Sequence, residues 1–289
     1  MNAGKLALAR TFDALGLNAA LLRLQRAWFG PHVRIVNYHD VPPSRAAEFE
    51  AQVRFFADRF APVGFRDLLA LQRGEWTARQ AGLVLSFDDG LRSHAEVVAP
   101  ILERYGFVGW FVVPVGFVEA PASEQAAFAR AHQIHAAAEY SDARLALSWD
   151  DVRRLDAKHI VGCHTWNHTR LASTLPPDQL EHEIPGAKRR LEEELGHAVE
   201  LFAWVGGEEW AYSAEAARAV RRAGFRLGFM TNNAVVRPGC DLLQLQRTNL
   251  EADFSPALVR FHLCGFLDAL YAPKRARVNH LTAPPEGLA

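Results

Sequence analysis

Two neighbouring carboxylates and two histidines are the side chains of this 289-residue sequence best suited to chemistry. Asp88 and Asp89 follow one short apolar run, and His164 and His168 follow another. Carboxylate and neutral imidazole are the usual ligands of a catalytic zinc ion, which binds three protein groups and keeps one position for water. Asp89, His164 and His168 could supply such a set, and Asp88 would then face the substrate from the next position along the chain.

Each half of this pattern also has a simpler interpretation. Asp89-Gly90 after a strand is an ordinary turn signal, and two histidines in a loop are commonly solvated. The spacing of His164 and His168 also occurs in helical zinc proteases, which carry Glu directly after the first histidine as the general base. Thr165 occupies that position here. The two halves in one chain favour a metal site.

The elements that must position these residues are short strands alternating with helices. Apolar runs predict seven strands, over residues 33–38, 83–86, 108–113, 160–163, 201–204, 225–230 and 242–246. Such alternation predicts a parallel sheet. Parallel α/β folds carry their functional side chains at the carboxyl ends of the strands, which is where Asp88 and His164 fall.

The composition limits the class of protein. The hydrophobic content of 49% and charged content of 22% are typical of a soluble globular protein, and the net charge of -1 gives no basic excess for nucleic acid. An odd number of cysteines, without the spacing of a disulfide framework, indicates reduced thiols at Cys163, Cys240 and Cys264. No signal peptide is apparent, so we expect a cytoplasmic protein; the sequence does not indicate its oligomeric state.

A family resemblance follows from these motifs and their order. Two segments resemble the first two motifs of the polysaccharide deacetylases (carbohydrate esterase family 4, the NodB homology domain), namely Ser86-Phe87-Asp88-Asp89-Gly90 and His164-Thr165-x-x-His168. Further similar segments cover residues 36–39, 147–152 and 202–207. The resemblance extends over residues 33 to 266.

The resemblance implies a distorted, incomplete (β/α) barrel of about seven parallel strands. It implies a metal-dependent hydrolase that removes N-acetyl groups from an amino sugar in a glycan or exopolysaccharide precursor. By resemblance, Asp88 is the catalytic base, and Asp89, His164 and His168 bind one divalent metal ion. Zinc is the first choice, with cobalt, nickel or manganese as alternatives.

The third motif departs from the family pattern. Residues 204–207 stand where many relatives carry an arginine that orients the base, or a Tyr-Pro-Tyr-Gly turn. The backbone N–H of Gly206 could still serve as an oxyanion donor. We expect Thr165, Trp204 and Gly206 to contact the substrate.

The general acid of the family has no clean counterpart either. His262 has the nearest position, but the residues around it have helical periodicity. His39 ends the first strand and should face the rim that carries Asp88, so we expect it to act as the acid or to orient the substrate; a structural role is the alternative. Arg247, at the end of the last strand, could orient Asp88 in place of the absent arginine.

Two other functions stay open at this point. The first is hydrolysis of another amide, an N-formyl group or a cyclic ureide, on the same fold. The second is a catalytically silent, glycan-binding barrel, which the weakened third and last motifs would suit and the intact first two oppose.

We expect one domain over residues 1–289. It comprises an amino-terminal helical lead (1–30), the barrel (31–272) and a loose tail (273–289). Residues 4–28 predict an amphipathic helix with basic residues among its leucines. It could lie on the inner face of an anionic membrane, as a peripheral contact, or close one end of the barrel.

Overall fold

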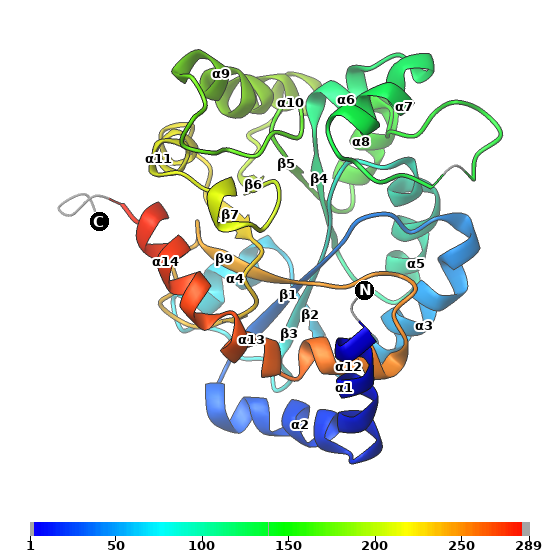
Figure 1. Ribbon diagram of the computed structural model, residues 1–289, viewed down its shortest axis with the longest axis vertical. Coiled ribbons are helices and arrows are strands. Elements are labelled where there is room, and N and C mark those ends of the chain that lie inside the picture. The colour runs from blue at the N-terminus through cyan, green and yellow to red at the C-terminus, as the bar shows by residue number, and fades with distance from the viewer. Residues whose placement is uncertain (1–2, 138, 285–289) are drawn as a thin grey trace.

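Seven parallel strands form a closed barrel in the computed structural model, which describes residues 3–137 and 139–284 (Figure 1). The barrel strands are β1 (Val33–Tyr38), β3 (Gly82–Phe87), β4 (Gly109–Val113), β5 (Ile160–Cys163), β6 (Leu201–Ala203), β7 (Leu227–Met230) and β9 (Leu245–Asn249). They pair in this order, and β9 pairs with β1 to close the ring. The seven predicted strands are confirmed, one fewer than in an eight-stranded barrel.

Two strands of two residues extend the sheet outside the ring. β2 (Ala61–Pro62) pairs in parallel with β3, and β8 (Val235–Val236) pairs antiparallel with β1.

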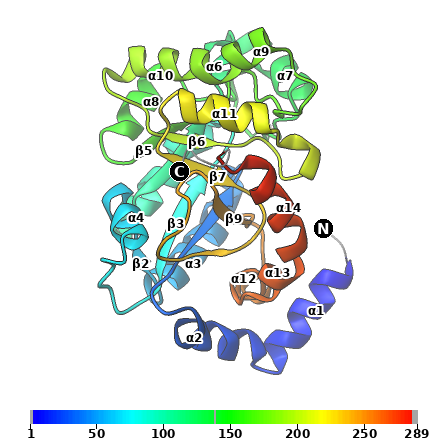
Figure 2. The same cartoon turned by 90° about the vertical axis from the view of Figure 1, so that its left-hand side faces the viewer.

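Helices surround the barrel, as Figures 1 and 2 show. The α-helices are α1 (Ala3–Ala14), α2 (Leu17–Phe29), α3 (Ala46–Ala57), α4 (Phe65–Gln72), α5 (Ala99–Arg104), α6 (Val115–Glu119), α7 (Ala122–Ala131), α8 (Trp149–Asp156), α9 (Pro177–Glu181), α10 (Ala187–Leu195), α11 (Ala214–Arg222), α12 (Pro256–Leu263), α13 (Phe266–Leu270) and α14 (Ala272–Thr282). Single turns of 3-10 helix occur at η1 (Pro43–Arg45) and η4 (Glu209–Ala211), and π-helical turns at η2 (His94–Val98) and η3 (His182–Gly186).

Alternate side chains of each strand point into the barrel, and the others pack beneath the helices. The inner apolar cluster includes Ile35, Val84, Val112, Ala203 and Phe229. Their sequence neighbours Val36, Leu85, Val113, Phe202 and Met230 belong to the outer cluster, which also contains helix side chains. At the carboxyl ends the same inward alternation places polar side chains, Asn37, Ser86 and Arg247, which are buried. The alternation of the strands therefore aims these polar groups into the upper part of the barrel.

The amino end of the barrel is closed by apolar packing. Leu68 and Leu71 of α4 belong to the inner cluster, and the Trp110 indole donates a hydrogen bond to the Val63 carbonyl at 3.2 Å. The barrel is therefore filled from below, and its open end is the one that carries the polar side chains.

The amino-terminal segment forms two helices instead of the single helix predicted over residues 4–28. Gly16 lies between them with a φ of 71°, a left-handed conformation that ends a helix and that glycine adopts at little cost. The apolar periodicity alone did not predict this break.

Both helices pack on the barrel next to α12 (Figure 2). The ring of Phe12 in α1 lies 5.6 Å from that of Phe261, and Gln25 in α2 donates a hydrogen bond to the Leu263 carbonyl at 2.6 Å. The segment therefore packs against the barrel through α12, and its contact with a membrane stays a prediction.

The predicted loose tail is wrong for residues 273–282, which are helical in α14. Pro273 lies in the first helical turn, where a missing N–H costs no hydrogen bond. Val278 is fully buried, and Arg221 of α11 donates a hydrogen bond to the Thr282 carbonyl at 3.1 Å. Burial of one apolar face therefore orders this segment; residues 285–289 of the predicted tail lie outside the described residues.

Within residues 3–137 and 139–284, no helix combines the length and the apolar character needed to cross a bilayer. Cys163, Cys240 and Cys264 are free thiols, as the sequence predicts.

Candidate active site

The structure brings Asp89, His164 and His168 together at the carboxyl end of the barrel. β3 ends at Phe87 and β5 ends at Cys163, so Asp89 and His164 lie just beyond two strands that each pair with β4. The Oδ1 atom of Asp89 is 3.6 Å from Nε2 of His164 and 3.1 Å from Nε2 of His168. All three side chains are buried, and their potential ligand atoms lie within 4.8 Å of one another.

The donor atoms of this group fit a divalent metal ion. The Nδ1 atoms of His164 and His168 lie 2.9 Å and 2.7 Å from the carbonyl oxygens of Ala203 and His132. Each Nδ1 must carry the hydrogen to make that bond, which leaves a lone pair on each Nε2. The Oδ1 atom of Asp89 is buried without a hydrogen-bond donor. Two ligands about 2.1 Å from a tetrahedral zinc ion are about 3.4 Å apart, close to the observed separations.

Burial also favours the neutral form of His164. It lowers the pKa of His164 to about 4, against the opposing charge of Asp88. The imidazole is therefore neutral at physiological pH, which is the form that binds a metal ion.

Three non-glycine residues of the site have left-handed backbone conformations. The φ angles are 77° at Asp89, 63° at Thr165 and 54° at His168. Such conformations cost on the order of 1–3 kcal/mol each and persist only where the surrounding structure imposes them. Their concentration around the ligand group indicates that the fold maintains this geometry against local backbone preference.

The second carboxylate, Asp88, is held by an arginine from the far side of the sequence. Arg247 donates to Oδ1 at 2.5 Å and to Oδ2 at 2.8 Å, and Asn37 donates to Oδ2 at 3.3 Å. Burial alone would raise the pKa of Asp88, but the charge of Arg247 outweighs it and the pKa is lowered. Asp88 is therefore an ionised carboxylate with a fixed orientation, 4.0 Å from Nε2 of His164.

Arg247 lies inside β9 and not at a strand end as expected, because β9 runs from Leu245 to Asn249. Its inward position lets the guanidinium reach Asp88 across the barrel. Asn37 was not predicted, although a polar residue within an apolar strand at an inward position was a signal for it.

His39 lies at the same rim and is paired with an acidic residue. Its Nδ1 atom is 3.4 Å from Oε1 of Glu251, and its side chain is 34% exposed. Burial lowers the pKa of His39, but its hydrogen bond to the Glu251 carboxylate and the charge of Asp89 outweigh burial, so the pKa rises to about 9. Glu251 was not predicted, because no local pattern links two residues so far apart in the sequence.

His262 has a different setting, on helix α12 as the periodicity predicts. Its Nδ1 atom lies 2.8 Å from the Asn249 carbonyl, and burial lowers its pKa to about 4. Its ring packs against Phe254, with the centroids 5.1 Å apart. These contacts are structural, and none of them is with the carboxylates of the site.

The three residues expected to contact the substrate, Thr165, Trp204 and Gly206, have different surroundings in the structure. Trp204 packs outward in the layer beneath the helices, against Phe202 and Tyr212, so the expected contact of Trp204 with the substrate is wrong. Thr165 is fully buried, and its hydroxyl accepts a hydrogen bond from the Thr169 amide at 2.9 Å. Both residues support the site from behind it.

Gly206 lies at the rim with a φ of 77°. A side chain at this position would meet the Glu208 carboxylate at 2.6 Å and the Arg170 guanidinium at 2.9 Å. The absence of a side chain therefore allows these two charged groups to approach the strand end.

An exposed tryptophan adds to this rim and was not predicted. Trp210 is 61% exposed, and the Arg170 guanidinium lies 5.7 Å from the centre of its ring. Arg170 follows the candidate ligand His168 by two residues and contacts Glu208 at 3.3 Å. Arg170 therefore connects the flat aromatic surface of Trp210 to the loop that carries His168, a candidate metal ligand.

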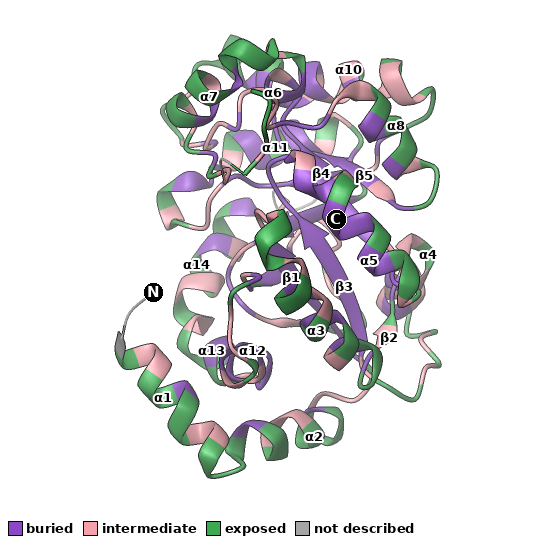
Figure 3. Cartoon of the chain, turned by 90° about the vertical axis from the view of Figure 1, so that its right-hand side faces the viewer, coloured by how far each residue is buried: buried purple, intermediate pink, exposed green. Residues whose placement is uncertain are grey.

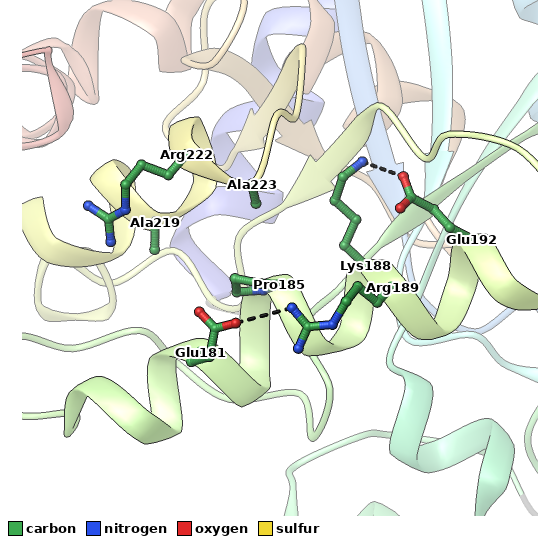
Figure 4. Close-up of a pocket in the computed structure, with 8 residues that line it drawn as sticks. All are labelled: Glu181, Pro185, Lys188, Arg189, Glu192, Ala219, Arg222 and Ala223. Carbon is green, nitrogen blue, oxygen red and sulfur yellow. Dashed lines mark hydrogen bonds and ion pairs between the residues drawn. The ribbon is translucent and has the colours of Figure 1, made fainter.

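A separate cavity of about 350 Å³ lies between the α9–α10 segment and α11 (Figure 4). Two ion pairs lie along it, with Arg189 3.1 Å from Glu181 and Lys188 2.6 Å from Glu192, and Arg222 also lines it. None of its lining residues belongs to the site described above.

Several solved structures share this fold. The deacetylase PplD of Streptococcus pyogenes, solved in complex with acetate, matches with a TM-score of 0.62 and 20% identity, over 80% of this chain and 98% of its own. A de-N-acetylase from Aggregatibacter actinomycetemcomitans matches with a TM-score of 0.62 and 16% identity, over 80% and 99%. IcaB from Ammonifex degensii matches with a TM-score of 0.59 and 19% identity, over 83% and 98%.

The sequence comparisons identify the family. No curated protein matches the chain. The family model described as polysaccharide deacetylase matches residues 77–228, which is more than half of the chain and includes Asp88, Asp89, His164 and His168. The chain therefore belongs to the polysaccharide deacetylase family.

Proposed function

We propose that this protein is a metal-dependent hydrolase that removes N-acetyl groups from an amino sugar of a glycan or exopolysaccharide precursor. The observation that carries the proposal is the buried group of Asp89, His164 and His168 beside an ionised carboxylate that an arginine orients. The names of two relatives agree with it, since one is a de-N-acetylase and one was solved with acetate. A silent glycan-binding barrel would have no need of such a set.

Asp89, His164 and His168 would hold the metal ion, with zinc as our first choice. A divalent ion held there would supply Lewis-acid chemistry, by acidifying water and polarising the amide carbonyl. Asp88 accepts the proton of the attacking water, because Arg247 keeps it ionised and fixes which oxygen faces the site. The backbone N–H of Gly206 is our candidate donor to the oxyanion.

His39 would donate a proton to the departing amine nitrogen. A hydrogen bond to Glu251 favours the protonated imidazole that this role needs. Trp210 offers a flat apolar face on which a neighbouring sugar ring of the glycan can pack.

The test of the proposed function is acetate release from a panel of N-acetylated glycans, together with the metal content of the purified protein. We expect acetate and free amine in equal amounts, and loss of both after chelation. Turnover of N-formyl compounds or cyclic ureides, with the glycan panel inert, would contradict the proposal and favour another amide hydrolase.

Glu251→Gln should move the alkaline limb of the kcat/KM profile to lower pH. An acid must be protonated to act, so activity falls as pH rises through the pKa of His39. The Glu251 carboxylate raises that pKa, and the neutral amide would not, so the fall should begin earlier. Parent and variant share Asp89 and the bound metal, so the difference reports Glu251 alone.

Glu209→Gln is the matched control for this experiment. It removes the same charge at the same end of the barrel, from a side chain that contacts Arg277 at 2.8 Å. An alkaline limb that stays in place in Glu251→Gln, or that moves equally in both variants, would contradict the assigned role of Glu251.

A further inference from the structure

The amino-terminal segment with α1 and α2 carries most of the large apolar side chains that are well exposed among the described residues. Among the described residues, nine large apolar side chains are well exposed, and five of them lie in this segment: Leu8, Leu15, Leu17, Leu24 and Trp28. Leu15 is 68% and Trp28 is 58% exposed. Figure 3 shows α1 and α2 as an outer layer with long exposed stretches. Large apolar side chains exposed together in one segment mark a candidate interaction site.

The spacing of these five side chains, which we call the apolar ridge, places them in two rows along the helices. Leu17, Leu24 and Trp28 fall on one side of α2, because a helix turns by 100° per residue. Leu8 and Leu15 are seven residues apart and share one side of the α1 segment. Phe266 of α13, which is 40% exposed, contacts Phe12 of α1 with the ring centroids 5.4 Å apart and extends the apolar surface.

A cavity rich in arginine lies on another side of α2 than Leu17, Leu24 and Trp28. It has a volume of about 330 Å³ and lies between α2 and the barrel. Four arginines line it, Arg23, Arg26, Arg59 and Arg260, and its lining contains no carboxylate. Arg260 is neutralised by Asp13, at 2.6 Å, and Arg59 reaches its nearest carboxylate, Asp58, only at 3.8 Å. Arg23 and Arg26 make no ion pair with any described residue, so the cavity has a net positive charge.

The amino-terminal segment as a whole also has a net positive charge. Between residues 3 and 30 it carries four basic residues and one acidic one, whereas the whole chain has a net charge of -1. Positive charge is therefore concentrated in the same two-helix segment that exposes the apolar side chains, with Arg23 and Arg26 on another side of α2 than its exposed leucines. A surface that combines both properties is complementary to anionic lipid headgroups above an apolar layer.

We infer that α1 and α2 dock the protein on an anionic bilayer surface. Leu15, Leu17, Leu24 and Trp28 insert at the boundary between headgroups and acyl chains, where tryptophan is favoured. Arg23 and Arg26 bind lipid phosphates, which the planar guanidinium contacts through paired hydrogen bonds. This inference does not depend on the proposed catalytic function.

A second copy of the chain is a less suitable partner for this surface. A two-fold contact places the same patch of each copy against the other, so a dimer that used the whole outer surface of α2 would bring the unpaired arginines of both copies to one interface. That repulsion opposes self-association, whereas anionic phosphates would relieve it.

Docking through α2 would fix how the barrel is oriented relative to the bilayer. α2 leads directly into the amino end of β1, whereas the candidate metal site lies at the carboxyl ends of the strands. α2 lies across the end of the barrel in Figures 1 and 2. A protein docked through α2 therefore opens its active site away from the bilayer and toward substrate in the aqueous phase.

The test is sedimentation of the full-length protein with vesicles. We expect binding to vesicles that contain phosphatidylglycerol, weakening as salt is added, and little binding to pure phosphatidylcholine. Arg23→Glu/Arg26→Glu should bind roughly twentyfold or more weakly, since each basic residue near an anionic surface contributes roughly fivefold. Leu24→Ser/Trp28→Ser should bind at least about tenfold more weakly.

Matched controls use the opposite surface of the protein. Arg218→Glu/Arg222→Glu in α11 makes the same change in net charge, and Leu281→Ser removes an equally exposed leucine; both should bind like the parent. Thermal unfolding of each variant checks that it is folded. Acetate release should be unchanged in all of them, so a failed docking proposal and a failed catalytic proposal give different results.

Four outcomes would overturn the inference. They are no sedimentation with either vesicle, equal binding to both compositions, equal weakening in the control variants, and a parent dimer that Leu24→Ser/Trp28→Ser converts to monomers. In the first of these cases, binding of soluble glycerol phosphate would assign the cavity to a free phosphate ester.

Discussion

Asp88→Asn is expected to retain its metal ion and to lose turnover by about 10²–10⁴, the usual contribution of a general base. The amide has nearly the shape of the carboxylate but cannot accept a proton at neutral pH. Asp88 is held by Arg247 at 2.5 Å and 2.8 Å, and the ligand group consists of its neighbour and the two histidines. Removing its charge should therefore leave the ligands in place.

Asp89→Ala is the paired experiment, and it should lose both metal and activity. His164→Ala and His168→Ala should also reduce the bound metal, because three protein ligands are needed for a tight site. Elemental analysis of the purified variants, followed by acetate release after metal is added back, separates the two carboxylates. If Asp88→Asn loses as much metal as Asp89→Ala, the division of labour between them is wrong.

His39→Ala is expected to lose activity by about 10²–10⁴ while its metal content stays that of the parent. The imidazole faces the rim from the end of β1, with Glu251 at 3.4 Å and no place in the ligand group. His262→Ala should keep parental activity, because its ring packs in α12 against Phe254 and bonds to the Asn249 carbonyl.

The two variants form a matched pair, since each removes one histidine. Metal content, kcat and KM of both are the measurements, and substrates with good leaving groups are the discriminating probe. An acid matters less when the leaving group is good, so His39→Ala should recover part of its rate on an activated acetyl ester. Equal losses on activated and unactivated substrates would indicate an orienting role, and a larger loss in His262→Ala would refute the assignment.

The strands and the ligand group could be predicted from the sequence because their signals are local. Each barrel strand is a short apolar run, and each such run was found. Asp89 and His164 directly follow two of these runs, and the rule that parallel strands present their carboxyl ends on one side was enough to place them together. The break at Gly16 and the helix α14 were missed, because tertiary packing decides where a weak amphipathic pattern folds.

The partners of the two acid–base groups could not be predicted in the same way. Arg247 was suspected of orienting Asp88 only because it falls near a predicted strand end, and Glu251 was not found at all. Asp88 directly follows β3 and Arg247 lies on β9, and these strands are not neighbours in the ring, as β1 separates them. Whether two such side chains meet depends on which face each strand presents to the barrel interior.

The sequence by itself therefore determined the strand set, the family and the three candidate metal ligands. The tertiary structure alone decided that Trp204 faces outward, that Arg247 reaches Asp88 and that Glu251 pairs with His39. The physical reason is that side chains alternate between two faces of a strand, so a boundary error of one residue exchanges inside and outside. Closure of the ring fixes that alternation, and closure is a property of all seven strands together.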